Sequence, residues 1–458
     1  MPKVNNKKCY FSDYVIFQKI NKNNYILIHT YFNNIDIIEE DIAQQLLAIK
    51  AEQDVENMDT VVLDELLQKC YLVEDKTADK ERFFAVVDKL AETNNKHLTY
   101  TLIPSYACNF SCPYCFEGGV TRNRNNIIMD TKLVDIIFAI MEKEKMNGYS
   151  LSFSLFGGEP LRKENIEINR YIFKKAKEHN LKIAVITNGY DLDKYMAYIK
   201  NNIFSNFQIT FDGTQEYHNK NKFTQNDKDT FSKLLNNIKL ILKTRTKVQI
   251  QVRINTNKEN LGSLKKLQNI FDKLNFTKDK RFSFYTKSVD ECENRKHKET
   301  SDVDIVHKVK FSPNKVQNMY TNSQYSFIFK ELNAVFSPKR KFGNFKIYFC
   351  GANGSNKLID PLGDVYSCLE EVGKSSRKVG YVDQFNKKII PTELAKEWAE
   401  RTVRNIPECS ECAYALICGG GCGVAAFKNK GALYMPWCGQ NKEIAQEVIC
   451  EIAKKIEV

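Results

Sequence analysis

The sequence predicts an α/β protein built around a parallel sheet. From about residue 97 to 290, short runs of strand character alternate with helical stretches. Repeated units of this kind form a parallel sheet, either doubly wound or closed into an incomplete barrel. The chain has 458 residues and 43% hydrophobic residues. That length exceeds one ordinary core and that composition is typical of a folded protein, so two or three domains are expected.

The alternating region supplies the expected elements in order. Strands are predicted over Leu98–Ile103, Ser150–Phe156, Lys182–Thr187, Phe207–Phe211, Val248–Ile254 and Arg281–Tyr285. Helices between them are predicted over Asp130–Lys145, Lys163–Glu178, Asp229–Lys243 and Leu261–Leu274. In parallel folds of this class, ligands bind at the carboxyl ends of the strands. Residues at those strand ends are therefore the first candidates for a functional site.

The segments on either side have different patterns. Residues 1–90 suggest a small winged-helix-like module, because they mix strands and helices at short range. The strands are expected at Tyr14–Gln18, Tyr25–Thr30 and Tyr71–Val73, and the helices at Ile37–Ile49, Val61–Lys69 and through Lys89. Residues 291–345 suggest a linker or bridging region, with one helix candidate around Ser326–Val335. Residues 346–458 are rich in Gly and Cys and end in a predicted helix, Lys442–Lys455.

Composition excludes several classes of protein. No stretch approaches the roughly 20 apolar residues of a membrane helix, and no apolar run of signal-peptide length follows the first residues. A cytoplasmic protein is therefore expected, and its 14 cysteines argue against a disulfide scaffold, because cytoplasmic thiols stay reduced. The net charge of +12 is spread out, which favours a solvated lysine-rich surface over nucleic-acid binding. Steering of an acidic peptide partner is the weaker alternative.

A first group of cysteines follows the first predicted strand. Cys108, Cys112 and Cys115 stand in a C-x3-C-x2-C spacing, with Tyr114 before the last of them. Three thiolates on one loop can hold three irons of a [4Fe–4S] cubane and leave the fourth iron open, whereas a structural zinc ion would need a fourth protein ligand. This spacing resembles the radical SAM superfamily, whose open iron binds the amino and carboxylate groups of S-adenosyl-L-methionine (SAM). The resemblance implies a partial (β/α)6 TIM-type barrel over residues 97–290.

Further segments at successive strand ends extend this resemblance. Gly157-Gly158-Glu159 resembles the family's GGE motif, which contacts the methionine amino group; glycines suit close approach and a carboxylate suits an ammonium group. By position, Asn188 and Asp212 resemble segments that line the SAM site. The resemblance further suggests Thr210 as a ribose contact and Arg253 as a partner of the SAM carboxylate. For Thr210 and Arg253 a purely structural role is equally compatible with the sequence, and a zinc loop is the alternative for the cysteine trio.

A second group of cysteines lies near the C-terminus. It resembles the SPASM extension, which binds auxiliary [4Fe–4S] clusters in radical SAM enzymes that modify peptides and proteins. The resemblance implies an outer cluster on Cys409, Cys412, Cys418 and Cys438, and an inner cluster on Cys350, Cys368 and Cys422. Either Cys292 completes the inner cluster or one of its irons stays open, where a substrate thiolate would bind. A zinc ribbon is the alternative, and Cys9, Cys70 and Cys450 are expected to be ordinary thiols.

The resemblance also implies an activity. Reductive cleavage of SAM would yield a 5′-deoxyadenosyl radical, which would abstract hydrogen from a bound peptide. Two substrates fit: a ribosomally made, Cys-containing precursor peptide whose thiols form thioethers, or a sulfatase whose active-site Cys or Ser becomes formylglycine. Three [4Fe–4S] clusters, SAM and an external electron donor such as flavodoxin or ferredoxin are implied. No residue is identified as the catalytic base.

Two features favour the precursor peptide. Sulfatase-maturing enzymes carry an Asp base directly after the cysteine that matches Cys368, whereas Leu369 and Glu370 follow it here. They also begin close to the first cysteine motif, whereas 107 residues precede Cys108. Residues 1–90 look like a peptide-recognition (RRE-like) module, in which a leader peptide adds to a strand edge. Carbon–carbon crosslinking, epimerisation and a non-enzymatic, zinc-stabilised peptide-binding protein remain compatible with the same motifs.

Overall fold

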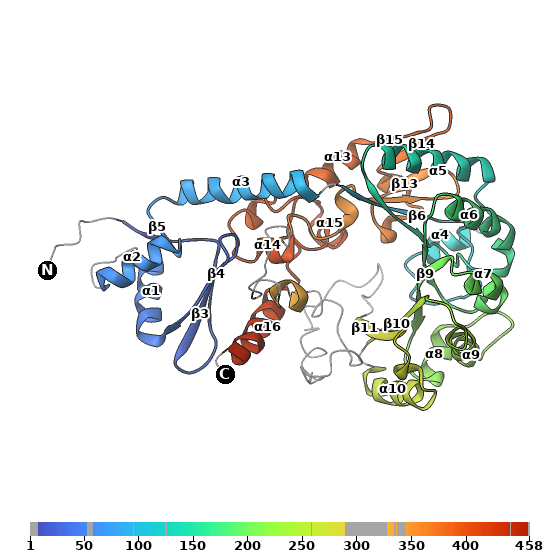
Figure 1. The fold of residues 1–458 in the computed structure, drawn as a ribbon, viewed down its shortest axis with the longest axis horizontal. Coiled ribbons are helices and arrows are strands. Elements are labelled where there is room, and N and C mark those ends of the chain that lie inside the picture. Colours follow the sequence, from blue (N-terminus) through green and yellow to red (C-terminus); the bar gives the residue numbers. More distant parts are fainter. Residues whose placement is uncertain are drawn as a thin grey trace. The chain divides into compact units, whose positions relative to one another are not determined.

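The chain forms two compact units. The computed structural model describes residues 8–52, 58–94, 96–123, 126–257, 259–288, 328–333, 336, 345–439 and 441–456 (Figure 1). Unit 1 draws on Met1–Asn95, Gln324–Cys350 and Ala399–Val458, and unit 2 on Lys96–Ser323 and Gly351–Trp398. Each unit is therefore assembled from segments that are far apart in the sequence. No helix in the described part of the chain is long and apolar enough to cross a membrane.

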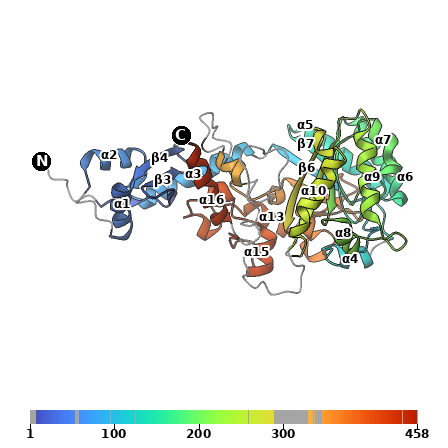
Figure 2. The same cartoon turned by 90° about the horizontal axis from the view of Figure 1, so that it is seen from below.

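Unit 2 contains the predicted barrel. Six parallel strands pair in sequence order, and all six were expected: β6 (His97–Leu102), β7 (Ser150–Leu155), β8 (Ile183–Thr187), β9 (Phe204–Phe211), β10 (Gln249–Thr256) and β11 (Phe282–Ser288). The main helices connecting them lie along the outside of the strands (Figures 1 and 2): α5 (Thr131–Met146), α6 (Ile166–Glu178), α7 (Met196–Lys200), α9 (Thr230–Leu242) and α10 (Leu264–Lys273). This arrangement confirms the partial α/β barrel. Three short helices of this region were not anticipated: α4 (Gly118–Asn123), α7 and α8 (Gln215–Asn221).

Local sequence explains why these helices form where they do. Asp130 caps α5 by accepting a hydrogen bond from the Leu133 backbone N–H at 2.7 Å, and Asp229 caps α9 in the same way. Such caps satisfy backbone donors that a helix start leaves unpaired. The residues of α5 that face the sheet recur at helical spacing and are buried: Leu133, Val134, Ile137, Phe138 and Met141. The amphipathic pattern thus fixes both the helix and the face that packs on the strands.

The sheet continues beyond the six predicted strands. Strand β12 (Asn356–Ile359) pairs in parallel with β6, and three antiparallel strands follow: β13 (Asp364–Tyr366), β14 (Gly380–Asp383) and β15 (Lys388–Pro391). Cys368 lies just after β13. The loop that follows it packs on the barrel through Leu369 and Val372, which contact a cluster that contains Ile103 and Phe156. The segment around Cys368 is therefore part of unit 2.

Unit 1 begins with a three-stranded antiparallel sheet. Its order is β2 (Val15–Lys19), β3 (Asn24–His29), β4 (Asn34–Glu39), followed by α1 (Glu40–Glu52), α2 (Thr60–Gln68) and α3 (Lys76–Asn94); the short strands β1 (Tyr10–Phe11) and β5 (Leu72–Val73) pair with each other. The helix expected from Ile37 starts instead at Glu40. Ile37 lies in β4 because it pairs with Ile26 of β3, an interaction that local helical spacing does not reveal.

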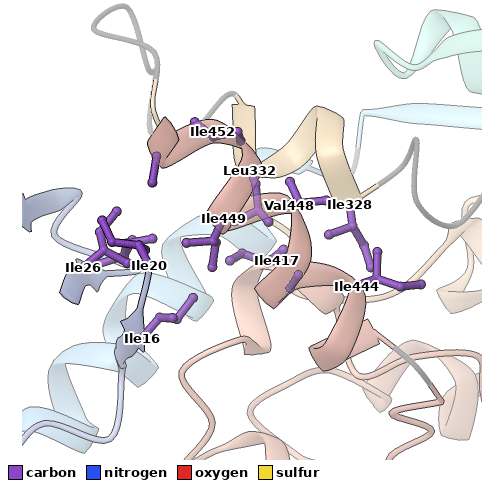
Figure 3. Packing of buried hydrophobic residues seen from close by; sticks show 13 residues of the cluster. Ile16, Ile20, Ile26, Ile328, Leu332, Ile417, Ile444, Val448, Ile449 and Ile452 are labelled. Atoms are coloured by element: carbon purple, nitrogen blue, oxygen red, sulfur yellow. The ribbon is translucent and has the colours of Figure 1, made fainter. Parts of the chain in front are cut away.

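One hydrophobic core joins both ends of the chain within unit 1. Ile16 of β2 and Ile26 of β3 belong to the same buried cluster as Ile449 of α16 (Asn441–Ile456), together with Ile328, Leu332, Ile417, Ile444, Val448 and Ile452 (Figure 3). Residues 328–333 are helical, within the predicted Ser326–Val335 helix, and α16 matches the predicted terminal helix. Most of the expected 291–345 linker, including Cys292, lies outside the described residues.

Candidate functional site at the cysteine loop of the barrel

The first cysteine group lies on the loop between β6 and α4. The Phe110 backbone N–H donates to Cys108 Sγ at 3.4 Å. Burial, followed by the nearby charges of Glu159, Cys112 and Cys115, raises the pKa of the Cys108 thiol. The three thiols are thus close enough to influence each other electrostatically. A soft donor set of three thiols on one loop fits the three irons that a cubane with an open position would need.

The Gly157–Gly158 turn packs against the chain that leads into this loop. Gly158 has φ +52°, and a Cβ there would lie 2.3 Å from the Ala107 carbonyl oxygen. The next residue, Glu159, donates its backbone N–H to the same oxygen at 2.9 Å. A side chain at residue 158 would therefore displace the backbone immediately before Cys108. The close approach that glycine permits here is between the segment after β7 and the cysteine loop.

Glu159 connects two strand ends. Its buried carboxylate accepts hydrogen bonds from Thr187 Oγ1 at 2.6 Å, the Asn188 backbone N–H at 2.6 Å and the Leu161 backbone N–H at 2.9 Å. Burial raises its pKa to about 7, against the effect of these donors. A carboxylate has about four acceptor positions, so the three donors leave one for a ligand. Its predicted contact with the SAM amino group stays a prediction.

Asn188 ties the end of β8 to the cysteine loop. Its Nδ2 donates to Asn109 Oδ1 at 2.7 Å, and Asn109 lies directly after Cys108. Its own side-chain oxygen accepts the Tyr190 backbone N–H at 2.9 Å. The structure thus brings Asn188 to the loop, as expected from its position. Asn109 was not anticipated, because the cysteine spacing says nothing about the residues between the cysteines.

A buried lysine lies beside the same cysteines. Lys222 Nζ is 3.8 Å from Cys112 Sγ and 5.5 Å from the ring centroid of Tyr114. Tyr114 in turn donates its hydroxyl to the buried carboxylate of Asp212. Burial alone would lower the pKa of Lys222, but Cys112, Tyr114 and Asp212 raise it well above its usual value. A fixed cation next to a thiolate group suits a cluster with net negative charge. Lys222 was not predicted from the sequence, because a lysine at the end of a short helix usually faces solvent.

The two remaining predicted SAM contacts, Thr210 and Arg253, lie on neighbouring strands. Thr210 of β9 stands opposite Arg253 of β10 in the parallel register. Arg253 Nε donates to Asn255 Oδ1 at 3.0 Å, and its charge opposes the rise that burial causes in the pKa of Asp212. Arg253, Asp212 and Tyr114 therefore share one neighbourhood.

The C-terminal cysteines fall into two sets. Burial and then Cys412, Cys418 and Cys438 raise the pKa of Cys409 to about 12, so the predicted outer set is gathered within unit 1. Of the predicted inner set, Cys350 and Cys422 belong to unit 1 and Cys368 to unit 2, so this set stays a prediction. In the described part of the chain, no three His, Cys, Asp or Glu side chains are spaced to hold one metal ion.

Comparison with known proteins agrees with this geometry. The family model "Radical SAM superfamily" matches residues 102–268. A cysteine-type anaerobic sulfatase-maturating enzyme of Clostridium novyi (strain NT) is 23% identical over 351 residues, which are 71% of this chain and 88% of the relative. The radical SAM cyclopropyl synthase TigE of Paramaledivibacter caminithermalis (strain DSM 15212 / CIP 107654 / DViRD3) is 21% identical over 472 residues, covering 94% of this chain and 93% of the relative.

A solved structure, native anSMEcpe with bound AdoMet, shares the fold. Its TM-score is 0.56 at 18% sequence identity, covering 78% of this chain and 100% of that one. The matched family region begins at the end of β6 and contains the cysteine loop, Glu159 and Asp212. A radical SAM domain implies one [4Fe–4S] cluster and SAM, and the thiol set and the neighbouring Lys222 fit such a cluster. Residues 102–268 therefore form the radical SAM domain of an enzyme.

Proposed function

We propose that this enzyme is a peptide maturase, which abstracts hydrogen from a ribosomally made, Cys-containing precursor peptide and installs a thioether crosslink. The observation that carries the proposal is a strand edge. The three-stranded sheet of unit 1 leaves β4 at its margin, in the same compact unit as the four cysteines of the outer set. A leader peptide is the partner that such an edge fits, because extended peptides bind by adding a strand.

The two margins of this sheet differ. Gln18 of β2 donates its side-chain amide to the Gln446 carbonyl of α16 at 2.7 Å, so that margin lies against unit 1 itself. Along β4, no strand in the described part of the chain pairs with the outer side. Ile37 on β4 is 37% exposed, which offers apolar surface to a peptide. Exposed strand edges pair readily with other chains, so we expect the leader to add at β4.

The loop after Cys368 supports a peptide over a sulfatase. Leu369 follows the cysteine where the sulfatase-maturing pattern has an Asp base. Glu371, two residues further, is buried and forms an ion pair with Arg377, which holds this carboxylate in place. Sulfatase maturation remains the second candidate, because the Clostridium novyi relative carries that name. Carbon–carbon crosslinking, epimerisation and a zinc-stabilised peptide-binding protein are the further alternatives.

The proposal includes three [4Fe–4S] clusters, SAM, an external electron donor such as flavodoxin or ferredoxin, and a cytoplasmic location. When bound and reduced, the first cluster and SAM together supply a hydrogen-abstracting radical. The protein positions this chemistry. Gly158 and Asn188 hold the cysteine loop against the strand ends, Glu159 offers its remaining acceptor position to an ammonium group, and Lys222 places a positive charge beside Cys112.

The test uses short Cys-containing peptides encoded beside the gene. Each is incubated anaerobically with reconstituted enzyme, SAM and a reductant, and its intact mass and free-thiol count are recorded. A thioether requires the loss of two hydrogens and of one free thiol per event. Hydrogen loss with every thiol still free would indicate carbon–carbon crosslinking. SAM cleavage without any change in the peptides would favour the sulfatase.

Metal analysis tests the clusters separately. Three cubanes require about twelve irons per chain. Cys112→Ala should remove about a third of the iron, whereas Cys450→Ala is the matched control, because Cys450 packs beside the apolar core at α16. Zinc without sulfide would contradict the enzyme proposal. A loss of iron in Cys450→Ala equal to that in Cys112→Ala would contradict the ligand assignment.

A further inference from the structure

A buried arginine lies among the cysteines of unit 1. Arg401 directly follows α13 (Glu393–Glu400), and only 3% of it is exposed. Its guanidinium donates to four backbone carbonyls: Leu433 at 2.6 Å, Gly421 at 2.9 Å, Gly420 at 3.0 Å and Met435 at 3.1 Å. The planar five-donor geometry of arginine suits such a set of acceptors. Neither the cysteine spacing nor the chemistry described above accounts for this residue.

These carbonyls belong to two segments that carry cysteines. Gly420 and Gly421 lie between Cys418 and Cys422, and Leu433 and Met435 precede Cys438. The glycine segment is tightly built: residues 419, 420 and 421 have φ +70°, +80° and +70°, and a Cβ on Gly421 would lie 1.8 Å from the Trp437 carbonyl oxygen. Arg401 thus fastens the loop between Cys418 and Cys422 to the segment before Cys438.

Four carbonyls satisfy hydrogen-bond donors but carry no counter-charge. In the described part of the chain, no carboxylate forms an ion pair with Arg401. A buried cation without an anion is costly. Burial lowers the pKa of Arg401, whereas the thiols of Cys409, Cys422, Cys350 and Cys418 raise it, so thiols are the neighbouring groups that can balance its charge. Two of these cysteines belong to the predicted outer set and two to the inner set.

We propose that Arg401 is the counter-cation of the auxiliary iron–sulfur centres, a positioning residue that fastens their cysteine segments and stabilises their reduced state. The inference rests on the auxiliary clusters of the proposed function. A thiolate-bound cubane is anionic and becomes more so when it takes up an electron, so a fixed positive charge beside it favours reduction. Charge near a cluster is one of the properties that set its potential.

The experiment compares three variants with the wild type. Arg401→Gln removes the positive charge. Arg401→Lys keeps the charge but loses the planar, five-donor geometry of the guanidinium. Arg404→Gln is the matched control, because Arg404 is only half-buried and already pairs with the carboxylate of Asp88. Each protein is reconstituted anaerobically, assayed for iron and sulfide per chain, and reduced stepwise with dithionite as electron donor while EPR spectra are recorded. The first cluster is identified by the change that added SAM produces in its spectrum.

The expected result is a selective shift. In Arg401→Gln the reduction potentials of the auxiliary clusters should fall by at least about 59 mV, which is a tenfold change in the equilibrium constant of a one-electron reduction. The potential of the SAM-sensitive cluster should stay at its wild-type value. Arg401→Lys should shift less, and Arg404→Gln not at all. If Arg401→Gln retains the iron and sulfide of its auxiliary clusters and their reduction potentials are unchanged, the proposal is overturned.

Two further outcomes are also decisive. If Arg401→Gln does not retain auxiliary iron, Arg401→Lys decides: retained iron with near wild-type potentials supports the role of the charge. If Arg401→Lys also loses auxiliary iron, or if its auxiliary potentials shift by the full tenfold change in equilibrium constant, the shape of the guanidinium matters and not its charge. Either result would overturn the proposal that Arg401 is a counter-cation. If the wild type itself holds only about four irons per chain, the auxiliary centres of the proposed function fail, a result distinct from unchanged potentials in a loaded variant.

Discussion

Tyr14 connects the N-terminal sheet to the outer cysteine set, and its removal offers a sharp test of this connection. Its ring stacks on Phe83 of α3 with centroids 4.3 Å apart, and its hydroxyl donates to the Ser410 carbonyl at 2.8 Å. Ser410 follows Cys409. The tyrosine is 1% exposed. Two substitutions, Tyr14→Phe and Tyr14→Ala, separate the hydrogen bond from the packing.

The expected magnitudes differ between the two variants. Tyr14→Phe leaves the buried Ser410 carbonyl without its tyrosine donor, which costs about 1–3 kcal/mol of the free energy of unfolding. Tyr14→Ala also removes a buried ring, for which large-to-small substitutions cost about 3–5 kcal/mol. The sum approaches the roughly 5–15 kcal/mol that stabilises a typical domain. We therefore expect Tyr14→Phe to weaken unit 1 and Tyr14→Ala to unfold it.

Hydrogen exchange followed by mass spectrometry is the suitable assay. In both variants, amide protection should fall together in residues 15–29 and in residues 405–415, whereas β7 to β9 of unit 2 should keep wild-type protection. Tyr381→Phe is the control, because Tyr381 is 50% exposed on β14, and it should change stability by no more than about 0.5 kcal/mol. Loss of protection in residues 15–29 with full protection of residues 405–415 would refute the connection.

Three other changes test the barrel and unit 1. Glu159→Gln should lower the melting temperature of the iron-free protein more than Thr187→Val does, because the amide replaces an acceptor of buried donors, at about 1.5–3 kcal/mol; equal melting temperatures would contradict this. Ile449→Ala should cost about 2–5 kcal/mol in urea unfolding, while the exposed Val61→Ala should cost almost nothing. Burial and then the charge of Arg82 lower the pKa of His29 from 6.5 to about 3. Below pH 6.5 His29 is therefore protonated in the unfolded chain but stays neutral in the folded protein. Stability from this group is complete above pH 6.5 and falls toward pH 3, by about 2 kcal/mol between pH 7 and pH 5; His29→Phe should abolish that difference in denaturant midpoints.

The barrel strands were predictable because each pairs with strands next to it in the sequence. The short strands β12 to β15 were not, because three or four residues give no period and β12 joins the barrel sheet through its pairing with the distant β6. Ile37 was assigned to a helix for the same reason: its partner Ile26 on β3 decides its conformation. Pairing across distance is therefore the main information that local patterns lack.

For the candidate site, too, local sequence patterns predicted some residues, whereas others depend on contacts between distant segments. Cysteine spacing and the glycine motif predicted the loop of Cys108, Cys112 and Cys115 as the candidate cluster site, because these three cysteines lie within eight residues. Lys222 and Arg401 escaped prediction, since a basic residue is expected on the surface and only the tertiary structure shows that it is buried. Asn109 escaped because its partner, Asn188, lies at the end of another strand.

The core shared by the two chain ends has a consequence for how the protein is made. Gln18 and Gln446, which join β2 to α16, are 428 positions apart. At a ribosomal rate of about 5–20 residues per second, roughly 20–90 s pass between the synthesis of β2 and that of α16. During this time the apolar face of β2 and β3 lacks the helix that covers it. The barrel strands, which pair in order of synthesis, need no such delay. The hydrophobic core that β2 and β3 share with α16 can therefore form only after α16 has been synthesised.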